Sequence, residues 1–135
     1  MTNKDLLEDA FAALAEGDGS RFTGLFADDF TWTLTGTTPW SGTYSGKDAV
    51  WRDLLRPLLK QFAGPYTNRA LRFVAEGDIV VVECRGHVET TSGKIYANSY
   101  CYICRFAGGK LRELVEYMDT DHLMQVLDPP YALLG

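Results

Sequence analysis

Carboxylates and an imidazole, the side chains best suited to proton transfer, fall on two apolar runs in the second half of the chain. His87 lies in the run 79–91, and Glu116 and Asp119 lie in the run 111–119. An imidazole titrates near neutral pH, and a carboxylate buried among Tyr and Trp would have a raised pKa. A group that titrates near neutrality can both take and deliver a proton. Glu116, His87 and Asp119 are therefore the candidate acid/base residues.

Each of these residues also has a purely structural interpretation. Glu116 and Asp119 are three positions apart, so on a strand they point to opposite faces, and at most one lines a cavity unless the strand ends between them. Asp119, followed by Thr120, is suited to capping a terminal helix, which makes Glu116 the better acid/base candidate. For His87 the alternative is a place on the outer face of the sheet, hydrogen-bonded or in a dimer contact.

Hydrogen-bond donors for a ligand oxygen gather on the run 94–106. Asn98, Tyr100 and Tyr102 alternate along it and share one face of the predicted strand. A buried amide and phenols can donate to a carbonyl or enolate oxygen. The alternatives are that the tyrosines point their hydroxyls to solvent and that Asn98 stabilises a turn.

The other candidate binding residues are one cation and two large aromatic side chains. Arg85 would hold a ligand carboxylate or would pair with Glu83 or Glu89. Trp32 and Trp40 would supply apolar walls for a polycyclic or aromatic ligand. Trp40 lies in a segment rich in Gly, Thr, Ser and Pro, where core packing explains it least easily.

No metal site is predicted. Cys101 and Cys104 are three positions apart, which on a strand directs the two sulfurs to opposite faces, and there is no second pair of ligands. The glycines form no phosphate-binding motif.

The elements that must position these residues form an α+β arrangement. A three-stranded antiparallel meander is predicted from two features. Apolar and polar residues alternate along the runs, and glycine-marked turns separate them at 91–94 and 107–110. The predicted strands are 30–35, 67–75, 79–91, 94–106 and 111–119. The predicted helices are 4–16, 20–26, 48–62 and 121–127. Pro57 should kink the third helix or leave one turn without its hydrogen bond. A loop is predicted at 36–46 and an apolar tail at 131–134. A curved antiparallel sheet packed on helices encloses a cone-shaped cavity, a common ligand site.

Composition limits the partners. The 135 residues predict a single domain, 1–135, and the net charge of −5 argues against nucleic acid or an anionic membrane as partner. Three cysteines, no apolar leader and no run of membrane-spanning length predict a reducing, cytoplasmic location.

Several short strings, taken in order, resemble the SnoaL-like group of the nuclear transport factor 2 (NTF2) and ketosteroid isomerase superfamily. They are Gly17-Asp18, Phe26–Phe30, Ser41–Lys47, Ala97–Tyr100, and Gly109–Leu111 with Glu116–Thr120. The resemblance implies the cystatin-like or NTF2-like fold, a cone-shaped α+β barrel over nearly the whole chain. It also implies an apolar small-molecule ligand, no cofactor and, as in many relatives, a homodimer.

Within this superfamily the resemblance separates three kinds of chemistry. The catalytic tyrosine and aspartate of ketosteroid isomerases fall at or near Ala10 and Leu34, so isomerase chemistry of that type is not expected. The Asp-Arg-Asp set of limonene epoxide hydrolases would correspond to His87, Arg85 and Glu116, with one of three residues matching in kind. The acid/base aspartate of polyketide cyclases corresponds to Asp119 or Glu116.

The leading hypothesis is a cofactor-free enzyme of the polyketide cyclase or isomerase type, acting by acid/base chemistry on an apolar carbonyl compound. The alternative is a non-catalytic ligand-binding or dimerisation module with the same cavity, and among enzymes an epoxide hydrolase. The burial of the candidate polar residues distinguishes the catalytic hypothesis from the binding hypothesis. Convergence of His87 and Glu116 with Asn98 in a closed pocket favours catalysis, whereas a cavity lined only by Trp, Phe and Leu favours binding.

Overall fold

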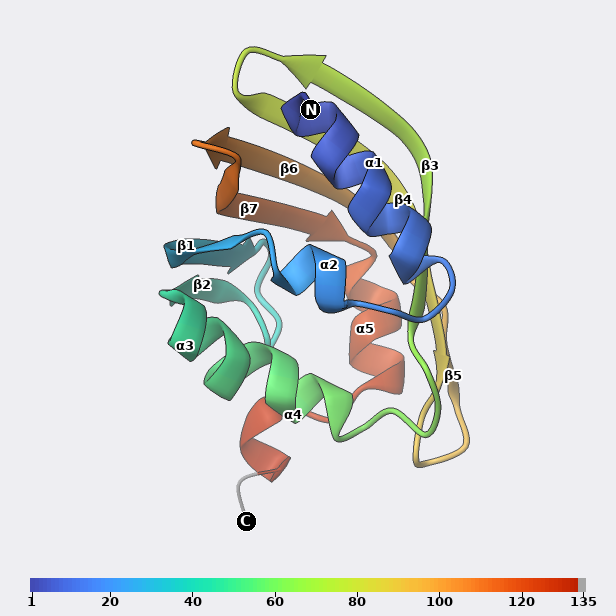
Figure 1. Cartoon of the computed structure of the whole chain (residues 1–135). Coiled ribbons are helices and arrows are strands. Elements are labelled where there is room, and N and C mark those ends of the chain that lie inside the picture. The colour runs from blue at the N-terminus through green and yellow to red at the C-terminus, as the bar shows by residue number, and fades with distance from the viewer. Residues whose placement is uncertain (134–135) are drawn as a thin grey trace.

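Helix α1 (Asn3–Leu14) begins where the sequence offers a cap. The Thr2 hydroxyl accepts the Asp5 N–H at 3.1 Å and the Asp5 carboxylate accepts the Thr2 N–H at 2.9 Å, a reciprocal capping box. The computed structural model, which describes residues 1–133, lays this helix across the concave face of a curved sheet (Figure 1). Its apolar stripe, including Leu7 and Phe11, is buried there.

The other helices are short and lie below α1 in Figure 1. They are α2 (Ser20–Thr23), α3 (Lys47–Ala49), the π-helical segment η1 (Val50–Leu55), α4 (Arg56–Leu59), α5 (Thr120–Val126) and the 3₁₀ turn η2 (Pro130–Leu133). Of the predicted apolar tail, 131–134, Leu134 lies outside the described residues.

The disturbance expected at Pro57 takes the form of a widened turn. In η1 the Arg56 N–H donates to the Trp51 carbonyl five residues earlier. Pro57 has no N–H, and its ring clashes with the carbonyl four residues before it in an α-helix, which favours such a π-type turn. Two large apolar side chains of this segment remain exposed, Trp51 at 51% and Leu59 at 46%.

The sheet has seven strands, ordered β2-β1-β7-β6-β4-β3, with β5 paired to β4. They are β1 (Phe26–Leu34), β2 (Gly42–Ser45), β3 (Thr67–Glu76), β4 (Ile79–Glu89), β5 (Ile95–Tyr96), β6 (Ser99–Ala107) and β7 (Lys110–Met118). The predicted meander corresponds to β4, β5 with β6, and β7, and the α+β class is confirmed.

Three details of the sheet differ from the prediction. The β1–β7 pair is parallel, with Trp32 opposite Leu114, so the sheet is not wholly antiparallel. The segment predicted as the loop 36–46 contains β2, and the run 94–106 is interrupted at residues 97–98. Alternation within one segment does not specify its partner, and strand pairing is decided by contacts distant in sequence.

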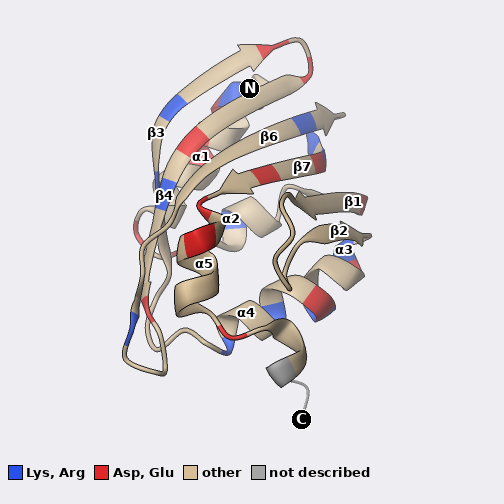
Figure 2. Ribbon diagram, turned by 180° about the vertical axis from the view of Figure 1, so that it is seen from behind, with Lys and Arg blue, Asp and Glu red and all other residues tan. Residues whose placement is uncertain are grey.

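The alternation in β4 separates the two faces of the sheet. Val80, Val82 and Cys84 are buried on the concave side, whereas Arg85 and His87 are exposed on the other. Figure 2 shows acidic and basic positions interspersed along the strands. Among them are the exposed ion pairs Arg72–Glu83, Arg105–Glu113 at 2.8 Å and Arg112–Asp29 at 2.8 Å. Such solvated pairs contribute little stability.

Within residues 1–133, no helix combines the length and the apolar character needed to cross a membrane. The same residues contain no group of three or more His, Cys, Asp and Glu placed to hold a metal ion. Cys104 is buried and Cys101 half-buried on the opposite face, as the spacing predicted.

Candidate functional site

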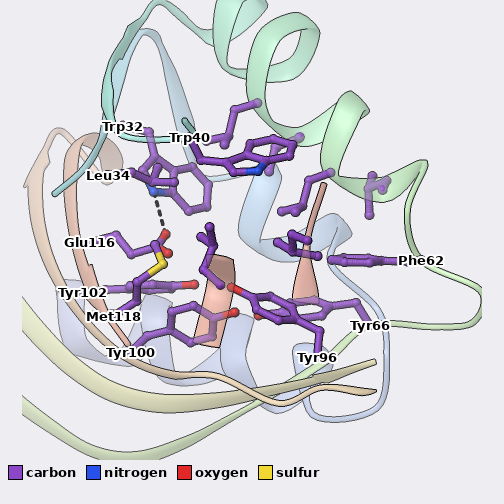
Figure 3. A pocket seen from close by; sticks show the side chains of 16 residues that line it. Trp32, Leu34, Trp40, Phe62, Tyr66, Tyr96, Tyr100, Tyr102, Glu116 and Met118 are labelled. Carbon is purple, nitrogen blue, oxygen red and sulfur yellow. Dashed lines mark hydrogen bonds between the residues drawn. The ribbon is translucent and has the colours of Figure 1, made fainter. Parts of the chain in front are cut away.

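Glu116 is a carboxylate held inside the molecule. On β7 the alternation places Leu114, Glu116 and Met118 towards the concave side, and Glu116 is 5% exposed. The Trp32 indole N–H donates to its Oε1 at 2.9 Å, joining β1 to β7 (Figure 3). Among residues 1–133 no side chain or backbone group donates to the other oxygen, Oε2.

Burial changes the protonation of Glu116. Removal from water disfavours the charged form and raises the pKa of the carboxyl to about 8, and the hydrogen bond from Trp32 opposes this increase. The group is therefore mostly a neutral acid at pH 7, and part of it ionises within the physiological range. Because Trp32 occupies Oε1 as a donor, the exchangeable proton belongs on Oε2.

Four tyrosine hydroxyls point into the space beside Glu116 (Figure 3). Tyr100 and Tyr102 come from β6, Tyr96 from β5, and Tyr66 from the segment before β3. Burial raises the pKa of all four phenols, that of Tyr96 to about 12. They stay neutral at physiological pH and can serve as hydrogen-bond donors to an oxyanion.

Two buried amides hold three of these hydroxyls in place. Asn68 donates through Nδ2 to Tyr66 at 3.2 Å and to Tyr102 at 3.5 Å. Asn98 donates through Nδ2 to Tyr96 at 2.9 Å. The hydroxyl positions therefore depend on the strand pairing that buries the two amides.

The rest of the cavity wall is apolar. Beyond Glu116 and the tyrosines it is lined by Trp, Leu, Phe and Met side chains, among them Trp32, Trp40 and Phe62, and its volume is about 100 Å³. Trp40 is 1% exposed, and its indole N–H donates to the Asp128 carbonyl at 3.0 Å. The loop tryptophan that core packing explained least easily thus forms part of the cavity wall.

The structure does not bring His87 and Arg85 to this cavity. Both are exposed on the outer face of β4, opposite Thr67 and Arg69 of β3. The expectation that His87 and Glu116 share one pocket is therefore wrong, because the alternation of β4 buries the apolar residues and directs the polar ones outward. Arg85 cannot reach a ligand inside the sheet, so the Asp-Arg-Asp arrangement is not assembled.

Asp119 and Asn98 take structural positions. Asp119 precedes α5 as its N-cap and accepts the His122 N–H at 3.1 Å, the alternative considered for it. Asn98 bridges two segments, because its Oδ1 accepts the N–H groups of Ser99 and Asp119. It does not line the cavity, but it contacts Tyr96, which does.

Sequence reasoning missed Tyr66, Tyr96 and Asn68. Tyr96 continues the alternation of Asn98, Tyr100 and Tyr102 by one step, so extending that face would have found it. Tyr66 is an aromatic residue in an irregular segment, the same signal that singled out Trp40. Nothing in the sequence pattern distinguishes Asn68 from an exposed strand residue.

Tyr66 reaches the cavity because Gly86 leaves space for its ring. A methyl group added at Gly86 would lie 2.8 Å from Cε2 and Cζ of Tyr66. We expect Gly86→Ala to destabilise the fold by about 1–3 kcal/mol, because the ring must be displaced. Chemical denaturation of a double-mutant cycle checks this, since in a Tyr66→Ala background the cost should nearly vanish. Equal costs in the two backgrounds would contradict the contact.

Comparisons with known proteins identify the domain family. The family model of the SnoaL-like domain matches residues 7–114. No curated protein matches the chain.

Solved structures share the fold at low sequence identity. An NTF2-like protein from Burkholderia thailandensis is 25% identical, with a TM-score of 0.79 over 96% of this chain and 99% of its own. TerC, co-crystallised with polyporic acid, is 19% identical, with a TM-score of 0.75 over 92% and 96%. A protein from Jannaschia sp. CCS1, provisionally named a SnoaL-like polyketide cyclase, is 16% identical, with a TM-score of 0.72 over 92% and 90%. The chain belongs to the SnoaL-like domain family and has the NTF2-like fold.

Proposed function

We propose that this protein is a cofactor-free enzyme that moves a proton on an apolar carbonyl compound, with Glu116 as the acid/base group. The observation that carries the proposal is a single buried carboxyl group, with a pKa near 8, beside four neutral tyrosine hydroxyls. Enclosed acid/base groups tuned towards neutral pH are typical of catalytic sites. A solved structure provisionally named a SnoaL-like polyketide cyclase is consistent with this chemistry.

The proposed step begins with the ionised form of Glu116. The carboxylate removes a proton from the carbon next to the substrate carbonyl, and the electron pair moves onto the carbonyl oxygen to form an enolate. Tyr100 or Tyr102 donates a hydrogen bond to that oxygen. In a cyclisation the enolate carbon attacks a second carbonyl of the same substrate, and the protonated Glu116 returns its proton to the resulting alkoxide.

Exchange of carbonyl-adjacent protons in D₂O tests this step without knowledge of the natural substrate. With 2-tetralone as probe, we expect Glu116→Gln to lower the NMR-measured exchange rate at least about 100-fold, because an amide cannot accept the proton. The wild-type rate should rise with pH and level off above about pH 8, as the carboxylate form accumulates.

Glu113→Gln is the matched control, since Glu113 lies on the same strand and pairs with Arg105 on the outer face. Its exchange rate should equal that of the wild type. Exchange that is no faster than in buffer, together with saturable binding of 2-tetralone, would instead support the non-catalytic ligand-binding module. The apolar wall of the cavity suits that second function.

A further inference from the structure

A second, larger pocket adjoins the cavity. It has a volume of about 400 Å³, opens to solvent, and reaches Phe22 on α2, Trp51 on η1 and Pro65. Five residues line both spaces, namely Trp32, Leu55, Leu59, Tyr66 and Tyr102. The inner cavity and this outer pocket are therefore separated by no more than the thickness of one side chain.

The volumes of the two spaces suit different parts of one ligand. Pockets that enclose a drug-sized ligand have volumes of roughly 300–1,000 Å³. The inner cavity, about 100 Å³, is below this range, and the outer pocket is within it. The inner cavity has room for a carbonyl group and its neighbours, so a larger substrate must extend outward.

The wall of the outer pocket matches an aromatic body. Trp51 lines this pocket and is 51% exposed, and Phe22 and Pro65 offer further flat apolar surface. An exposed indole at the mouth of an apolar pocket can pack against a ligand ring. Leu59, 46% exposed and shared by both spaces, stands where the ligand would pass.

One polar group in this wall lacks a partner. Asn68 is 1% exposed, and its Oδ1 accepts no hydrogen bond from any described residue, although its Nδ2 contacts two tyrosines. Unsatisfied buried acceptors are rare because each costs free energy. A ligand hydroxyl that donates to this oxygen would remove the cost.

From these observations we infer that the substrate spans both spaces. It is an elongated molecule whose carbonyl end enters the inner cavity beside Glu116 and whose aromatic, hydroxyl-bearing body occupies the outer pocket between Trp51 and Asn68. The inference rests on the proposed function for the identity of the carbonyl end. Its binding geometry can be tested separately from catalysis.

A matched pair of ketones provides the test. Cyclohexanone fits the inner cavity alone, and 4-phenylcyclohexanone adds a phenyl body at the far end. In ¹H–¹⁵N spectra the Trp32 indole N–H, held by Glu116, should shift with both, whereas the Trp51 indole should shift only with the phenyl compound. The phenyl compound should bind at least about tenfold more tightly, because it buries an aromatic ring.

A substitution at Gly64 blocks the outer pocket alone. Gly64 lines that pocket, and an added Cβ there meets nothing within 4 Å. Gly64→Leu should remove the affinity gained from the phenyl group and leave cyclohexanone binding unchanged, while Gly64→Ala should alter neither. Of the 3- and 4-hydroxyphenyl analogues, at least one should bind more tightly than the parent, and that gain should disappear in Asn68→Leu.

Different results would overturn the two-compartment inference, the assignment of Asn68 and the proposed function. Equal affinities for the two ketones, or a Trp51 signal that does not move, would overturn the two-compartment inference while leaving the role of Glu116 intact. Hydroxylated analogues that bind no better than the parent would overturn the assignment of Asn68. Proton exchange that does not depend on Glu116 would overturn the proposed function, and the Trp51 signal would still report where the ligand body binds.

Discussion

Glu116→Gln is expected to make the protein more stable than the wild type at pH 8 and about equally stable at pH 5. The folded state raises the pKa of Glu116 from 4.5 to about 8, so between these values the folded protein holds a proton that the unfolded chain has lost. Its contribution to the free energy of unfolding is fully present below pH 4.5 and declines by about 1.4 kcal/mol per pH unit up to about pH 8. The wild type thus loses roughly 3.5 kcal/mol relative to the variant between pH 5 and pH 8, because the slope flattens near each pKa.

Urea denaturation of both proteins across this pH range measures the difference directly. Glutamine keeps an oxygen for the Trp32 indole and carries no charge, so it removes the titration with little change of shape. Glu113→Gln, on the exposed side of β7, should instead follow the wild type at every pH. Parallel stability curves for wild type and Glu116→Gln would show that Glu116 is not shifted by burial.

Trp40→Ala is expected to destabilise the fold by about 3–5 kcal/mol, the usual cost of truncating a fully buried aromatic side chain. Trp40 is 1% exposed and holds the Asp128 carbonyl, so its loss opens the inner cavity and frees the segment after α5. Against a typical total stability of about 5–15 kcal/mol this is a large fraction.

Denaturation of Trp51→Ala supplies the matched comparison. The same substitution at a tryptophan that is 51% exposed should change the free energy of unfolding by less than about 1 kcal/mol. Trp40→Phe should fall between the two, because it keeps most of the packing and loses the hydrogen bond. Similar costs at Trp40 and Trp51 would contradict the assignment of Trp40 to the cavity wall.

Local patterns in the sequence determined the elements and their faces. Alternation in β4 separates Val80 and Val82 from Arg85 and His87, and burying the apolar set requires the polar set to face outward. His87 was assigned to the pocket because an imidazole suits acid/base chemistry. That assignment is wrong because the alternation of β4 puts His87 on the outward face. The caps at Thr2 and Asp119 were predictable because capping depends on residues within one turn.

These local patterns do not predict which distant segments pair. β2 is a four-residue strand in a segment rich in Gly and Thr, and it forms because β1 offers an edge with Trp32 opposite Tyr44. The parallel β1–β7 pair has the same origin. Neither segment carries a local signal for its partner.

The candidate site likewise has a part that the sequence predicts and a part that depends on contacts between distant segments. The sequence alone placed Glu116, Tyr100 and Tyr102 on strands, where alternate side chains face opposite sides of the sheet. It also showed the resemblance to the SnoaL-like group. Only the tertiary structure decided that Glu116 meets Trp32, 84 positions away along the chain, and that Tyr66 and Tyr96 join Tyr100 and Tyr102 in lining the cavity. The physical reason is that a pKa and a cavity are properties of what surrounds a side chain, and those surroundings come from strands that only folding brings together.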